Sequence, residues 1–137
     1  MQRLLGLVVV GLLVAAQPAK KDSLEGVWMA SSMEMGGQKL PDEQTKNIQL
    51  TFTADKATLN DGRGDKPASY KLDATKKPAT IDITRLDDSG KGTTLKGIYE
   101  IKGDTLKIAM LDGEGERPTT FESKPGTMII LIVFKKK

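Results

Sequence analysis

Residues 94–110, TLKGIYEIKGDTLKIAM, consist of two alternating runs separated by Gly103 and Asp104. Most apolar residues fall on one face of each run: Leu95, Gly97, Tyr99 and Ile101 in the first, and Leu106, Ile108 and Met110 in the second. Alternation with a period of two and one largely polar face is typical of half-buried antiparallel strands. A Gly-Asp pair between two such runs is typical of a tight two-residue turn. The stretch therefore predicts a β-hairpin.

The same alternation recurs in IQLTFT (48–53), SYKLD (69–73) and TIDIT (80–84). Short polar or glycine-containing segments separate these runs at even intervals. The one helical candidate is LPDEQTKN (40–47), because Pro41 presets a helical φ and acidic residues follow it at the positive end of the helix dipole. We expect one or two helical turns there. The chain predicts an all-β antiparallel domain of about eight to ten strands, either a sandwich or an up-and-down β-barrel.

The last apolar run, TMIILIVFKK (127–136), does not alternate. Every residue from Met128 to Phe134 is apolar. A strand of this kind is covered on both faces. In a barrel one face points into the lumen, and we expect the other to pack against an outer element such as the short helix at Pro41.

The first residues have the pattern of a secretory signal peptide. Arg3 is followed by an uncharged apolar run from Leu4 to Ala16, which is short for a membrane span. Small residues place a cleavage site after Ala16 or after Ala19. We expect residues 1–16 to be removed and residues 17–137 to form one mature domain. No cysteine is present for lipid attachment, so we expect a secreted or periplasmic protein without stable membrane insertion after cleavage.

Composition argues against several function classes. The chain has no histidine and no cysteine, so the commonest general base and the Ser-His-Asp and Cys-His arrangements are missing, and only carboxylates remain as zinc ligands. Its net charge is +3 without a concentrated basic stripe, which argues against nucleic acid as a partner. We therefore expect a non-enzymatic protein without a cofactor or a metal. A hydrolase that uses carboxylates alone is the least favoured class, and it would need opposed carboxylates in a cleft.

Several local motifs have a structural interpretation. The acidic pairs Asp87-Asp88 and the DGEGE stretch (112–116) are expected to be solvated loop charges, since a calcium loop begun at Asp112 would end on Ser123 rather than on an acid. The RGD at 63–65 fits a glycine-rich turn. The methionines at positions 29, 33 and 35 are placed by alternation on one face of the first strand, where packing is favoured over soft-metal binding.

The opening LEGVW (24–28) resembles the G-x-W that begins the first strand of lipocalins, in which the tryptophan closes one end of the barrel. Further blocks, GGQKLPDE, KPATIDIT, KGIYEIKGDTLKIAM, ERPTTFESKPGT and ILIVFKK, resemble the uncharacterised lipocalin-like domain abundant in planctomycete bacteria. This resemblance implies an exported lipocalin-like barrel and no known activity. In lipocalins a basic residue, often an arginine, lies over the tryptophan. No arginine follows Arg117 here, so Lys135 or Lys136 would have to substitute.

The inward faces supply candidate ligand-binding residues of the lumen: Trp28, Phe52, Tyr70, Gly97, Tyr99 and Met110. Trp28 is either a buried plug or a stacking surface, and Gly97 marks either a strand bend or the mouth of a cavity. The favoured function is an exported binding module for a small apolar ligand or for an envelope protein. The alternative is a structural or protein-interaction domain whose barrel is packed solid. An internal cavity distinguishes the two.

Overall fold

The computed structural model describes residues 24–87 and 91–137. This part of the chain contains nine strands and one short helix. They are β1 (Gly26–Met35), β2 (Gln38–Lys39), α2 (Asp42–Thr45), β3 (Gln49–Phe52), β4 (Lys56–Asn60), β5 (Asp65–Asp73), β6 (Ala79–Arg85), β7 (Thr94–Lys102), β8 (Thr105–Leu111) and β9 (Ile129–Lys136). The expected signal peptide, its cleavage sites and the start of the mature domain at Gln17 lie outside the described residues.

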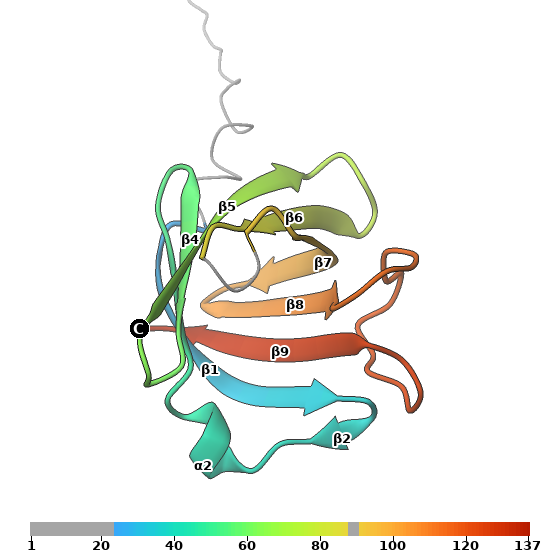
Figure 1. The fold of residues 1–137 in the computed structure, drawn as a ribbon, viewed down its shortest axis with the longest axis horizontal. Helices are drawn as coiled ribbons and strands as arrows, with labels where there is room; N and C mark the ends of the chain where they lie inside the picture. Colours follow the sequence, from blue (N-terminus) through green and yellow to red (C-terminus); the bar gives the residue numbers. More distant parts are fainter. Residues whose placement is uncertain (1–23, 88–90) are drawn as a thin grey trace, which may run out of the picture.

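The strands form a closed antiparallel barrel with up-and-down connections (Figure 1). From β3 to β9 each strand pairs with the next along the chain, β3 pairs with the first half of β1, and β9 returns to pair along the length of β1. The two-residue strand β2 pairs with the end of β1 and lies outside the ring. Eight strands therefore close the barrel, which confirms the all-β barrel prediction.

The predicted local elements are present. Gly103 and Asp104 connect β7 to β8, with Lys102 opposite Thr105 and Gly103 at a φ of 60°. Helix α2 is a single turn whose N-cap is Pro41, and its buried Thr45 donates a hydroxyl hydrogen bond to the Pro41 carbonyl at 3.2 Å. Both the hairpin turn and the short helix are thus confirmed.

A β-bulge in β1 changes which residues face the lumen. The pairing with β9 shifts register between Ala30 and Ser32. As a result Met33, opposite the core residue Ile132, packs against the inner core, whereas Met29 lies opposite Lys135. The prediction that the methionines of this strand share one face is wrong, because one extra residue in the bulge reverses the alternation.

The apolar residues on the outer face of β9 are covered, but not by the helix. Leu131 forms an outer cluster with Ile98 and Ala109, and Phe121 from the β8–β9 connection packs against it. Helix α2 instead contacts β1. We refer to residues 112–128 as the outer loop. The prediction that β9 is buried on both faces holds. The predicted covering element was wrong, because the outer loop covers this face and the helix packs against β1 instead.

The outer loop is anchored at two places. Arg117 Nη1 donates hydrogen bonds to the carbonyl oxygens of Gly97 (2.9 Å) and Ile81 (3.3 Å), and lies 2.8 Å from Asp82 Oδ1. The Asp82 oxygen has no hydrogen bond of its own, so its contact with Arg117 is one of charge. Further along, the Ser123 hydroxyl donates to the Ile129 carbonyl and accepts from the Gly37 amide. The loop therefore spans the outside of the sheet from β6 to the β1–β2 turn.

Candidate functional site

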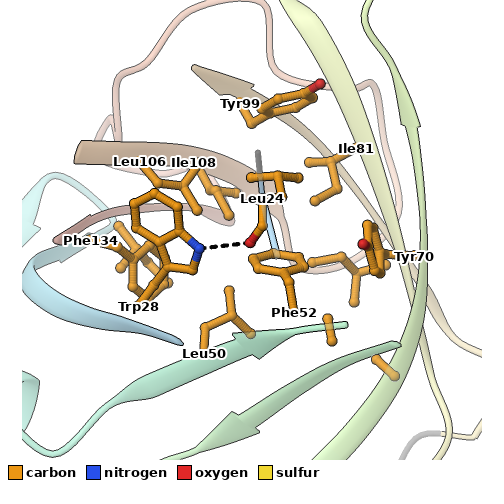
Figure 2. Close-up of a cluster of buried hydrophobic side chains, with 14 of the residues drawn as sticks. Leu24, Trp28, Leu50, Phe52, Tyr70, Ile81, Tyr99, Leu106, Ile108 and Phe134 are labelled. Atoms are coloured by element: carbon orange, nitrogen blue, oxygen red, sulfur yellow. Dashed lines mark hydrogen bonds between the residues drawn. The ribbon is translucent and has the colours of Figure 1, made fainter. Parts of the chain in front are cut away.

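One end of the barrel is closed by the segment that enters β1. Trp28 is almost fully buried, and its indole Nε1 donates a hydrogen bond to the Leu24 carbonyl at 2.8 Å (Figure 2). The ammonium of Lys136 lies 5.3 Å from the centroid of the indole ring, a cation–π distance, and also donates to the Glu25 carbonyl. Lys136 is thus the basic residue over the tryptophan. We call this the closed end.

Aromatic side chains fill the lumen next to the closed end (Figure 2). The rings of Phe52 and Tyr70 meet edge to face with centroids 5.0 Å apart, and the Tyr70 hydroxyl donates to the Thr53 carbonyl at 2.6 Å. Tyr99 is buried nearby. Its pKa is raised above 10.0 chiefly by burial and secondarily by the charge of Asp73. The hydrogen bond of the Tyr70 hydroxyl and the raised pKa of Tyr99 are both features of a tightly packed interior rather than of an open site.

The other half of the lumen is hollow. A cavity of about 260 Å³ lies there, and apolar residues form most of its wall: Met33, Leu50, Ala57, Leu59, Pro67, Ala68, Ile83, Leu95, Ile108, Met110, Ile130, Ile132 and Phe134. Ala57 on β4 and Ala68 on β5 lie opposite each other in the sheet. Because two facing inward positions carry only methyl groups, this side of the lumen is not filled. The cavity is larger than the roughly 150 Å³ apolar cavity that is known to accept benzene.

Charged side chains surround the cavity at its outer end, which we call the mouth. They are Lys66, Arg85, Asp87 and Asp112. Three of them continue an inward alternating row: Lys66 lies two residues before Ala68, and Arg85 and Asp112 lie two residues after Ile83 and Met110. A charged residue at the end of an apolar inward row places the edge of the lumen at that position.

Three of the four charged side chains at the mouth are held in ion pairs: Arg85 with Asp87, and Lys66 with Asp61. The Arg85 guanidinium donates to both oxygens of Asp87, from Nε at 3.2 Å and from Nη2 at 3.1 Å. These bonds raise the pKa of Arg85 above its ordinary value against the opposing effect of burial, and the charge of Asp112 adds to the increase. Lys66 Nζ donates to Asp61 at 2.8 Å, which lowers the pKa of the Asp61 carboxyl. The mouth therefore presents fixed charges of both signs.

The structure separates the candidate residues of the sequence analysis into three locations. Met110 lines the cavity. Four of them lie in the packed core near the closed end: Trp28, Phe52, Tyr70 and Tyr99. Gly97 lies in the barrel wall, where an added Cβ would come within 2.7 Å of the Ala109 carbonyl oxygen and 2.8 Å of Met110 Cγ. Its role here is the close approach of two strands.

Sequence reasoning missed the two alanines that leave the cavity open and the charged residues that ring it. Asp87 and Asp112, expected to be solvated loop charges, both line the mouth. Continuing each alternating row by one inward position would have found Lys66, Arg85 and Asp112. The two alanines indicate an unfilled lumen only once the pairing of β4 with β5 is known to place them opposite each other.

A second hollow, about 590 Å³, lies between α2 and the β4–β5 connection. Exposed polar residues such as Glu43, Gln44 and Asn47 form much of its wall, so it does not exclude water. Among residues 24–87 and 91–137 the acidic side chains form no group of three or more that could hold a metal ion. Within the same residues no helix has the length and apolar character needed to span a membrane.

No family model, curated protein or solved structure matches this chain. Its function is therefore inferred from the cavity and the residues around it.

Proposed function

We propose that this protein is an exported, non-enzymatic binding module of the lipocalin-like type, which holds a small apolar ligand in its lumen. The observation that carries the proposal is the cavity of about 260 Å³, walled mainly by aliphatic and methionine side chains. Ligand sites are concave and mostly apolar, with a few polar groups at fixed positions. The lumen has this composition, and its polar groups lie together at the mouth.

The energetics favour an apolar occupant. Moving an apolar molecule from water into such a cavity is favourable by roughly 25 cal/mol for each Å² of surface removed from water. A packed closed end limits the cost of binding, because aromatic side chains there are already fixed by contacts and hydrogen bonds. Little reorganisation is then needed when the ligand enters.

The proposed location and family rest on the sequence. The apolar run from Leu4 to Ala16 supports export to the periplasm or the medium. The G-x-W start, the position of Lys136 over Trp28 and the meander of strands support a lipocalin-like classification. An envelope protein is the other partner that such a location would offer, through the loops at the ends of the barrel.

Titration with the apolar fluorescent probe N-phenyl-1-naphthylamine tests the proposal. We expect saturable binding to the purified protein with one site per chain, and a probe-dependent increase in Tm. Ala68→Leu should abolish binding by filling the cavity. Lys71→Leu adds an apolar side chain on the same strand at an exposed position and should leave binding unchanged. A folded parent protein that shows no saturable binding would contradict the proposal and favour a structural or interaction role.

A further inference from the structure

The polar end of any ligand in this lumen must lie at the mouth. Below the mouth the cavity wall is built from apolar side chains such as Leu50, Ile108 and Phe134. A polar group buried there without a hydrogen bond would lose several kcal/mol of hydration. Hydrogen-bonding side chains begin at Lys66, Arg85, Asp87 and Asp112. The chemistry of these four residues therefore selects the polar end of the ligand.

The four side chains carry two positive and two negative charges, so their formal charges cancel. The negative charges are also close to the positive ones: Asp87 is hydrogen-bonded to Arg85 through two bonds, and Asp112 acts electrostatically on the same guanidinium. The ammonium of Lys66 is 2.8 Å from Asp61. Each cationic group at the mouth is thus within reach of a carboxylate.

A charged ligand end gains little at such a mouth. A carboxylate drawn to Arg85 would be repelled by Asp87 and Asp112, and an ammonium drawn to those acids would be repelled by Arg85. Either ion would also lose hydration on leaving bulk water. An uncharged hydroxyl or amide loses less, and can donate to a carboxylate or accept from the guanidinium.

We propose that the ligand is a neutral amphipathic molecule, with an apolar body in the lumen and an uncharged alcohol or amide end at the charged mouth. This inference rests on the proposed binding function and adds the chemical class of the ligand. It makes the four mouth residues determinants of specificity.

Competition between ligands of equal chain length tests the inference. Octanol, octylammonium and octanoate are each used to displace bound N-phenyl-1-naphthylamine from the parent protein. We expect octanol to displace the probe at the lowest concentration. An ion that displaces the probe more effectively than octanol would overturn the inference.

Because an apolar cavity disfavours any ion, variants of the mouth provide the decisive comparison. For each ion we take the ratio of its displacing strength to that of octanol. Asp112→Asn removes one negative charge and should raise this ratio for octanoate by about two- to fivefold, the effect of one partly exposed charge pair. Arg85→Gln removes one positive charge and should raise the ratio for octylammonium by a similar factor. Asp55→Asn makes the same charge change in the β3–β4 turn, away from the mouth, and should change neither ratio.

Ratios that stay constant in both mouth variants would show that the ligand end does not lie at these residues, and would overturn the inference. Should Arg85→Gln fail to fold, Asp112→Asn alone decides, since Asp112 is exposed. Absence of probe binding by the parent would instead contradict the binding function itself, so the two failures are distinguishable.

Discussion

Trp28 shows how one residue can define an end of the barrel. Its indole is buried, its N–H is bonded to the Leu24 carbonyl, and its ring lies under the Lys136 ammonium. Trp28→Ala should lower the free energy of unfolding by about 3–5 kcal/mol, because it removes a large buried ring. Trp28→Phe should lower it by less, because the phenyl ring keeps most of the packing. What it loses is the hydrogen bond to the Leu24 carbonyl. Urea denaturation followed by circular dichroism measures both changes.

Fluorescence provides an independent check, because the chain contains a single tryptophan. The emission of the parent should be blue-shifted and poorly quenched by iodide. The control for the stability measurement is Met29→Ala, on the same strand but outside the inner core. It should lower the free energy of unfolding by less than Trp28→Ala does. Red-shifted, freely quenched emission would contradict the burial of Trp28.

Tyr99 couples stability to high pH. Burial first, and the charge of Asp73 second, raise the pKa of Tyr99 above its ordinary value of 10.0. Between about pH 10 and the folded-state pKa, the unfolded chain has released the phenolic proton while the folded chain still holds it. Linkage then requires that stability falls as pH rises through this interval.

The free energy of unfolding of the parent should therefore decrease from about pH 10 upward more steeply than that of Tyr99→Phe. The two proteins share every other ionisable group, so the difference between the two curves isolates Tyr99. Denaturant titrations at closely spaced pH values give the measurement. Parallel curves would mean that the phenol ionises equally easily in the folded and unfolded states.

At the scale of elements, the outer loop holds the least predictable part of the fold. Phe121 covers Ile98 and Leu131, and Arg117 reaches carbonyl groups on two strands. Arg117→Gln should lower the free energy of unfolding by about 1–2 kcal/mol, because a charged donor to two carbonyls is lost and Asp82 loses its ion pair. Amides of residues 117–123 should exchange faster with solvent.

The control for this change is Lys102→Gln. The ammonium of Lys102, a highly exposed side chain, lies 3.9 Å from Glu100. Its removal should change stability by no more than about 0.5 kcal/mol. If Arg117→Gln were as mild as Lys102→Gln and left exchange unaltered, the loop would be held by Phe121 and Ser123 rather than by Arg117.

The strands and turns were predictable because their signals are local. Alternation and the Gly-Asp pair define β7, β8 and the turn between them within seventeen residues of sequence (94–110). The bulge after Ala30 was not predictable from alternation, since one inserted residue changes the facing of Met33 without changing composition. The segment that covers the outer face of β9 was also missed, because Phe121 reaches this face through a contact that depends on the path of the whole outer loop.

At the scale of the whole molecule, the site depended on which strands are neighbours. Closure of β9 onto β1 places Lys136 over Trp28, and the resemblance to lipocalins had left Lys135 and Lys136 as alternatives. The cavity depends on Ala57 and Ala68 facing the same space, which requires the register between β4 and β5. A single sequence reports that both residues are small, but not that they are opposite each other.

The barrel therefore has a packed half and a hollow half, and the two should respond oppositely to the same substitution. Ala30 and Ala68 are both buried and both belong to the inner core, but only Ala68 lines the cavity. Ala30→Leu, beside Trp28, should lower the free energy of unfolding by about 1–3 kcal/mol through overpacking. Ala68→Leu places the same side chain in free space and should leave stability unchanged or raise it by about 0.5–2 kcal/mol.

Urea denaturation of the two variants and the parent, with equal m-values required for the comparison, measures the difference. Probe binding measured on the same samples should be retained by any folded Ala30→Leu and lost by Ala68→Leu. A stable Ala68→Leu protein that no longer binds the probe would show that the free space in the lumen is needed for binding and not for folding. Equal losses of stability in both variants would mean that the barrel is packed along its whole length, and the hollow half would then not exist in solution.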